Sequence, residues 1–133
     1  MGRRQPMLAL VAVAAAAALA VLWVFAAPKI VGLGGADAPD VLWMWLLICS
    51  GPTLLLAAAC LLRPLHRRGA LRALIAGAVS TSVFWAFFHG TTRWEVTHHP
   101  GGGANIGLGL LMLFSPVLVL AVMRIAYAMG RRD

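Results

Sequence analysis

Long apolar runs separated by short polar segments dominate this chain. Four of the runs are long enough to cross a bilayer core of about 30 Å, which needs roughly 20 helical residues. The segments between them carry proline, glycine or both, which end helices. The pattern predicts an all-α membrane protein, one integral membrane domain over residues 1–133 that forms an antiparallel bundle of four transmembrane helices. The predicted spans are about residues 7–27, 41–62, 70–88 and 105–123.

Composition agrees with the pattern. The chain is 62% hydrophobic and 11% charged, whereas soluble domains are about 45–50% apolar and about 25% charged. A soluble core of this size cannot hide so much apolar surface, and we therefore expect the lipid bilayer to act as the solvent. The formal charge of +7 would suggest nucleic acid in a soluble protein. Here the basic residues flank apolar runs, so we expect membrane topology to explain them and no nucleic-acid partner.

The distribution of basic residues predicts the orientation. Of 11 lysines and arginines, only Lys29 and Arg93 fall outside the termini and the neighbourhood of the middle connector, residues 63–69. Basic residues favour the cytoplasmic side. We therefore expect both termini and the 63–69 loop in the cytoplasm, with loops 28–40 and 89–104 outside, in a plasma (inner) membrane. The abundance of Ala, Leu, Gly and Arg beside a single Lys suits a bacterial chain.

The first span also has some features of a secretory signal peptide. Basic residues precede it and small residues follow it. Its apolar run is longer than the 7–15 residues typical of a signal peptide's apolar region. We expect a retained membrane anchor.

Polar residues and prolines recur near the centres of three spans. Pro52 and Pro116 cannot donate to the carbonyls of Ile48 and Met112, so we expect kinks in the second and fourth spans. On one interpretation the nearby hydroxyls repair these breaks and bond between helices. On another they line a polar cavity at the membrane midplane, as in transporters with broken helices. The residues concerned are Ser50, Pro52, Thr53, Ser80, Ser82, Ser115 and Pro116.

Small residues recur at four-residue spacing in two spans. Ala12, Ala16 and Ala20 form one row, and Ala73 and Gly77 form another. Such rows let helices approach closely, within one chain or between copies. No Asp, Glu, Lys or His lies deep in a predicted span. Their absence there argues against a pump or a proton-coupled antiporter, which use ionisable residues inside the membrane.

The segment 89–103, HGTTRWEVTHHPGGG, gathers three of the four histidines. We interpret it as a polar outer loop, with a divalent-metal site formed by His89, His98, His99 and Glu95 as an alternative. The spacing matches no defined metal motif. Alternation over residues 93–99, and β-compatible residues at 29–33, also predict a small β-hairpin cap outside the membrane.

Tryptophans gather near the predicted outer ends of the spans, where an aromatic ring can anchor in the interface or contact a partner. With no catalytic or nucleotide-binding segment evident, we expect a non-enzymatic accessory, assembly or scaffolding component of a membrane complex. It would bind a membrane-protein partner or further copies of itself, and we predict no cofactor. The alternatives are a small oligomeric transporter or channel, and an outward-facing histidine site for metal binding or catalysis. The tryptophans proposed to contact a partner are Trp43, Trp45, Trp85 and Trp94.

Overall fold

The computed structural model describes residues 5–33, 39–99 and 106–132, and its regular elements over these ranges are helices. Four helical stretches in the described ranges are long and apolar enough to cross a membrane, which confirms the predicted all-helical class. The first is continuous from Pro6 to Ile30 but changes type along its length. The elements are α1 (Pro6–Ala20), the π-helical η1 (Val21–Ala26), α2 (Ala27–Ile30), α3 (Pro39–Leu62), α4 (Arg67–His98) and α5 (Ile106–Arg132).

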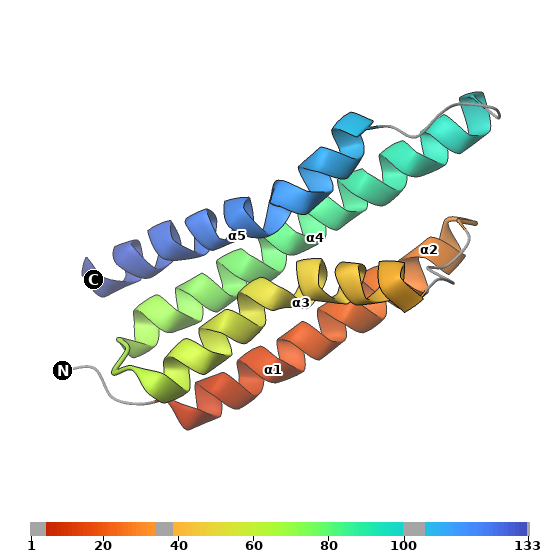
Figure 1. Cartoon of the computed structure of the whole chain (residues 1–133). Helices are drawn as coiled ribbons and strands as arrows, with labels where there is room; N and C mark the ends of the chain where they lie inside the picture. Colours follow the sequence, from red (N-terminus) through yellow and green to blue (C-terminus); the bar gives the residue numbers. More distant parts are fainter. Residues whose placement is uncertain (1–4, 34–38, 100–105, 133) are drawn as a thin grey trace.

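The helices run antiparallel to their neighbours in the chain (Figure 1), and α4 packs most extensively on α5 and α1 on α3. At one end, the backbone N–H of Gln5 donates to the carbonyl of Cys60 at 2.9 Å. At the same end, the N–H of His66 donates to the hydroxyl of Tyr127 at 3.2 Å. We call this the basic end, because Arg63, Arg67, Arg68, Arg124 and Arg131 belong to it. The opposite end, with α2, the end of α4 and the start of α5, is the far end.

Small residues hold the helices together toward the basic end. The buried side chains there include Ala9, Ala12, Ala57, Cys60 and Ala70. Glycines bring α4 and α5 still closer: a Cβ added to Gly69 would lie 2.8 Å from the carbonyl oxygen of Tyr127, and one added to Gly130 would lie 2.9 Å from the Cα of Gly69. The rows predicted from the sequence lie inside the bundle, since Ala12, Ala16, Ala20, Ala73 and Gly77 are all buried.

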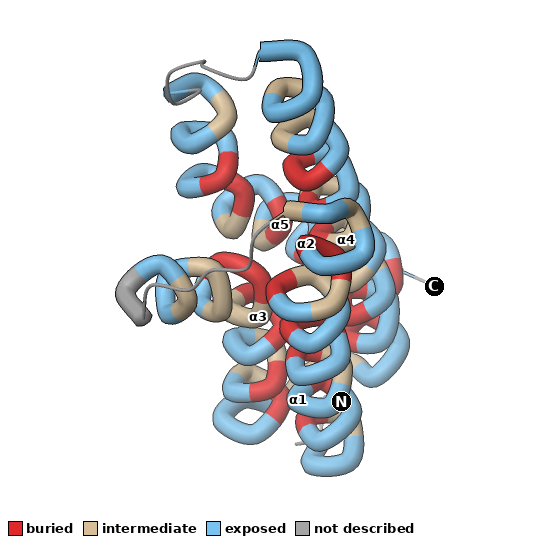
Figure 2. Tube along the Cα trace, turned by 90° about the vertical axis from the view of Figure 1, so that its right-hand side faces the viewer, coloured by how far each residue is buried: buried red, intermediate tan, exposed pale blue. Residues whose placement is uncertain are grey.

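Large side chains fill the bundle toward the far end. Its buried cluster includes Leu19, Ile48, Trp85, Phe88 and Met112. Figure 2 shows buried residues along the inner sides of the helices and exposed residues around the outside. Many exposed side chains within the spans are apolar, as expected for helices that lipid surrounds.

The second and fourth spans remain continuous helices although each contains a proline, Pro52 in α3 and Pro116 in α5. Both helices change direction near their middles in Figure 1. Proline removes one backbone hydrogen bond and its ring collides with the preceding turn, which accounts for a bend at each place.

The largest departure from the sequence prediction concerns the segment after residue 88. It was predicted to begin a loop, but residues 89–98 continue α4 to His98. The β-hairpin cap is not confirmed: residues 93–98 are helical, and Lys29 and Ile30 belong to α2. The alternation of polar and apolar residues suggested a strand, but the segment continues the helix, because no proline occurs between His66 and His99 to end it. Residues 34–38 and 100–105, including the predicted start of the fourth span, lie outside the described residues.

Candidate functional site

The end of α4 is stabilised locally by its own polar side chains. The hydroxyl of Thr92 donates to the carbonyl of Phe88 at 2.8 Å, and that of Thr97 to the carbonyl of Arg93 at 3.0 Å. Both bonds keep a threonine compatible with a helix. His99 leaves the helix with φ −131° and ψ 65°, since the residue before a proline disfavours the α conformation. We call residues 90–98 the α4 extension.

Helix continuation separates the predicted metal ligands. His89 and His98 are nine residues apart on one helix, which places them about 13 Å apart along its axis. His89 is buried, whereas His98 and His99 are exposed. Over the described ranges no three His, Cys, Asp or Glu side chains gather closely enough to hold a metal ion. The structure therefore does not bring His89 to the other three predicted ligands.

His89 instead faces the interior and bonds to the first helix. Its Nε2 lies 2.7 Å from the carbonyl oxygen of Trp23, and only 2% of the residue is exposed. Because a carbonyl can only accept, the proton of this bond is on Nε2. The interaction joins α4 to η1 across 66 positions of the sequence.

The π-helical segment explains why that carbonyl needs a partner. Ala27 donates its N–H to the carbonyl of Leu22, five residues back, instead of to Trp23. In the π pattern the partner of Trp23 would be residue 28, which is a proline and has no N–H. His89 supplies the missing donor. The indole N–H of Trp23 adds a second link to α4, donating to the hydroxyl of Ser82 at 3.1 Å.

Aromatic rings enclose His89. The ring centroids of Trp85 and Phe88 lie 5.4 and 5.6 Å from its centroid, and that of Trp45 lies 6.0 Å away. Trp45 also meets Trp85 edge-on at 5.5 Å. Trp85 is fully buried, so its ring packs inside this fold and does not lie on the surface where a partner was expected to contact it. Trp45 is half-buried in the same cluster, and its ring serves packing.

Three buried polar atoms form a row on the inner face of α4. They are Thr81 Oγ1, Trp85 Nε1 and His89 Nδ1, and none has a hydrogen-bond partner within the described part of the protein. Their spacing of four residues places them on one face. With Nε2 protonated, the neutral His89 ring offers Nδ1 as an acceptor beside the indole donor of Trp85. These three atoms therefore keep hydrogen-bonding capacity that the described part of the protein does not use. Thr81 stands between Ser80 and Ser82 in the polar group at the centre of the third span, and the sequence does not show that its hydroxyl faces the interior.

The predicted midplane hydroxyls bond mainly to their own helices. Ser50 donates to Leu46 at 2.5 Å and Ser80 to Ala76 at 2.7 Å. Thr53 donates to the carbonyl of Ser50 at 2.8 Å. Such bonds satisfy the hydroxyl without a second helix. Fewer hydroxyls are therefore left to line a polar cavity at the midplane than the sequence suggested.

Ser115 donates a hydrogen bond to the carbonyl that the neighbouring proline leaves without a backbone donor. Its hydroxyl donates to the carbonyl of Met112 at 2.8 Å, and this is the carbonyl that Pro116 leaves without its usual N–H. Ser115 and Ser80 line one surface groove of about 500 Å³ between α4 and α5, whose other lining residues are apolar. We call this the α4–α5 groove.

Two of the proposed partner tryptophans are on the surface. Trp43 is 67% exposed and Trp94 is 55% exposed. Trp94 stacks on His98 with ring centroids 4.7 Å apart and meets His99 edge-on at 5.7 Å. The α4 extension therefore carries an ordered set of aromatic rings at the far end.

Comparison with known protein families, curated proteins and solved structures finds no match to this chain.

Proposed function

We propose that this protein is a non-enzymatic accessory or assembly component of a membrane complex, and that it binds its partner through the α4 extension. In this proposal the chain lies in a bacterial inner membrane with its basic end in the cytoplasm, following the positive-inside rule. The far end then faces outward, and the α4 extension with it.

The observation that carries the proposal is an exposed stretch at the end of a long helix. None of the residues 90–98 is buried, although all are helical. Most helical stability in proteins comes from packing one face against other elements. A partner packed against Trp94 and His98 would bury these two exposed side chains. Tryptophan is also among the residues that most often dominate the energy of protein interfaces.

Helix length supports the same surface. α4 has 32 residues and so is about 48 Å long at 1.5 Å per residue. The hydrocarbon core is only about 30 Å thick. With the basic start of α4 at one membrane surface, the last two turns project beyond the hydrocarbon on the other side, within reach of a partner protein.

The other two functions receive less support. A transporter with a polar midplane needs hydroxyls that face a shared path, whereas Ser50, Thr53 and Ser115 donate within their own helices. A histidine-based site at the outer surface needs His89 near His98 or His99, and α4 separates them.

The proposal is tested by purifying the tagged protein from membranes in mild detergent. We expect a protein that co-purifies in a fixed ratio, and we expect Trp94→Ala combined with His98→Ala to remove it. Phe87→Ala is the matched control, because Phe87 is 56% exposed on the same helix but belongs to the lipid-facing span. Recovery of the wild-type protein alone, or equal loss in the control, would contradict the proposal.

A further inference from the structure

A groove runs between α3 and α5 in the half of the bundle near the basic end. It arises because α3 packs mainly on α1 and α5 mainly on α4, which leaves α3 and α5 in limited contact. The cavity is about 350 Å³, and Ala73 of α4 contributes to its lining. Most of the lining is apolar, including Pro52, Leu55, Ala59, Leu120 and Met123. We call this the α3–α5 groove.

The length of the α3–α5 groove matches one membrane leaflet. Its lining extends from Pro52 of α3 to Arg63, the residue directly after α3, which is eleven steps along the chain and about 16 Å at helical spacing. Half of a hydrocarbon core of about 30 Å is about 15 Å. The groove thus reaches from near the midplane to the membrane surface, as one acyl chain does.

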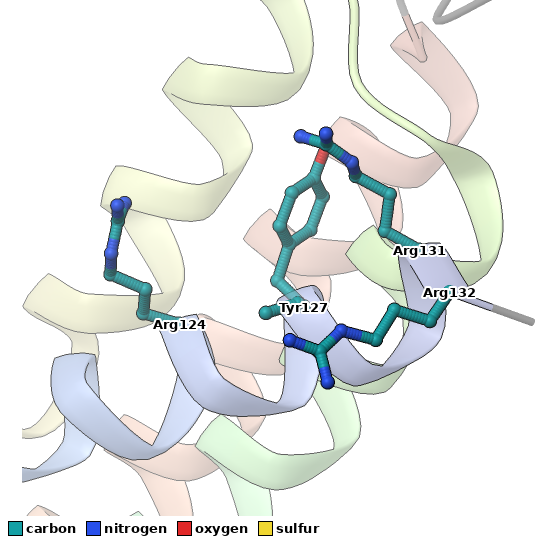
Figure 3. Close-up of a pocket in the computed structure, with 5 residues that line it drawn as sticks. Arg124, Tyr127, Arg131 and Arg132 are labelled. Carbon is teal, nitrogen blue, oxygen red and sulfur yellow. The ribbon is translucent and has the colours of Figure 1, made fainter.

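Positive charge lies at the surface end of the α3–α5 groove. Arg63, directly after α3, and Arg124 of α5 both line it, and Figure 3 shows the Arg124 side chain extending from α5 toward α3. Tyr127 lines it as well; its hydroxyl accepts from the N–H of His66 and can still donate its own proton. No acidic residue is among the described residues that line the cavity.

A second cavity adjoins this charged end. It is also about 350 Å³, and Arg131 and Arg132 line it together with Arg124 and Tyr127 (Figure 3). Guanidinium groups bind phosphate through paired N–H donors. Three arginines line this cavity, which shares Arg124 and Tyr127 with the apolar groove. Together they form a surface for an anionic group that carries an apolar tail.

We propose that the α3–α5 groove binds one anionic phospholipid of the leaflet at the basic end, with its phosphate between Arg63 and Arg124 and an acyl chain along Leu55, Ala59 and Leu120. Basic pockets between transmembrane helices are recognised sites for anionic headgroups. The α4–α5 groove provides the internal contrast. It is larger, at about 500 Å³, but no charged residue is among its lining residues in the described structure. That groove should accept acyl chains without preference for the headgroup.

Native mass spectrometry of the full-length protein in detergent tests the proposal. Phosphatidylglycerol and phosphatidylcholine with the same acyl chains are added in turn, with inorganic phosphate as a third arm. We expect phosphatidylglycerol to bind several-fold more tightly than phosphatidylcholine. Arg63→Gln and Arg124→Gln should each weaken its binding about fivefold, the effect of about one charge near a membrane surface. Arg67→Gln is the matched control at the same end, outside the groove, and should leave binding unchanged.

A second pair of variants tests the apolar part without changing charge. Ala59→Phe fills the groove and should weaken binding of both lipids, whereas Ala58→Phe, at an exposed neighbouring position, should not. Equal affinity for the two lipids, or equal loss in Arg67→Gln, would overturn the proposal in favour of general surface charge. Displacement of phosphatidylglycerol by equimolar inorganic phosphate would also overturn it, since the site would then recognise a free anion.

Discussion

The two halves of this bundle are packed by different means. Near the basic end, alanines and glycines let helix backbones touch, as at Gly69 and Gly130. Near the far end, the rings of Trp85, Phe88 and Trp45 fill the space between the helices. The difference shows two ways for a small membrane protein to gain cohesion without a hydrophobic driving force between helices. Backbone contact is repetitive along the chain, whereas ring packing depends on particular large side chains.

The polar chemistry follows the same division. The far half contains the π-helical η1, the bond from His89 to Trp23, and the row of unpartnered atoms on α4. The basic half keeps its charged groups at the surface, where they rim the α3–α5 groove. The far half therefore buries several polar groups between its helices, whereas the charged groups of the basic half lie at the rim of a groove.

Removing the central ring of the far half should have the largest effect. Trp85→Ala leaves a cavity among Trp45, Phe88 and His89, and should lower the free energy of unfolding by about 3 kcal/mol. SDS titration of the folded protein in mixed micelles measures this quantity. Phe87→Ala removes a similar ring from the lipid-facing side and should cost far less. If both variants lose the same stability, the far half is not held by ring packing.

Adding one methyl group to the basic half should have the next largest effect. In Gly69→Ala the new Cβ meets the backbone carbonyl of Tyr127 at 2.8 Å, and a backbone cannot move aside as a side chain can. We expect a loss of about 1–3 kcal/mol in the free energy of unfolding. Gly51→Ala is the matched control, because nothing lies within 4 Å of the added methyl. It should be neutral or stabilising by about 0.5–1 kcal/mol. A stable Gly69→Ala protein would show that the backbones are not in contact.

The bond between His89 and Trp23 should contribute about 1 kcal/mol, a typical value for polar contacts between membrane helices. His89→Phe keeps a ring in place but removes the donor. Pro28→Ala supplies a backbone N–H that can serve the same carbonyl. A double-mutant cycle isolates the link: His89→Phe should cost less stability in the Pro28→Ala background than in the wild type. Equal cost in both backgrounds would refute this explanation of the buried histidine.

The smallest stability effect should come from Trp94→Ala. The tryptophan side chain is 55% exposed, and its ring contacts are with the neighbouring His98 and His99. A surface substitution of this kind should change the free energy of unfolding by less than about 0.5 kcal/mol. The same SDS titration measures it, with Trp85→Ala as the contrast. A loss comparable to that of Trp85→Ala would mean that the α4 extension packs on its own bundle and has no face left for a partner.

The repetitive features were predictable from the sequence. Length and hydrophobicity predicted four helices, and the four-residue rows of Ala12 and Ala73 indicated close approach, which their burial matches. Hydrophobicity and residue spacing are each repeated over many positions, so one exceptional residue does not change the prediction. The orientation and the bacterial membrane remain predictions.

The particular features were not predictable. His89 was assigned to an outer loop because glycine, threonines and charges follow it, but the hydroxyls of Thr92 and Thr97 bond back to α4 and keep the segment helical. The π-helical η1 depends on Pro28 and on a histidine 66 positions after Trp23. A hydrogen bond between residues so far apart in the sequence cannot be recognised from any local sequence pattern. Trp85 lies near the end of its predicted span, and only the packing of three helices distinguishes it from an anchor residue.

The most direct test of the proposed function is photo-crosslinking in intact membranes. A benzophenone amino acid replaces Trp94 in one variant and Phe87 in another, both exposed positions on α4. We predict one discrete protein adduct from position 94 and only lipid adducts from position 87. Lipid adducts alone from position 94, or the same protein adduct from both positions, would contradict the claim that the α4 extension binds a partner.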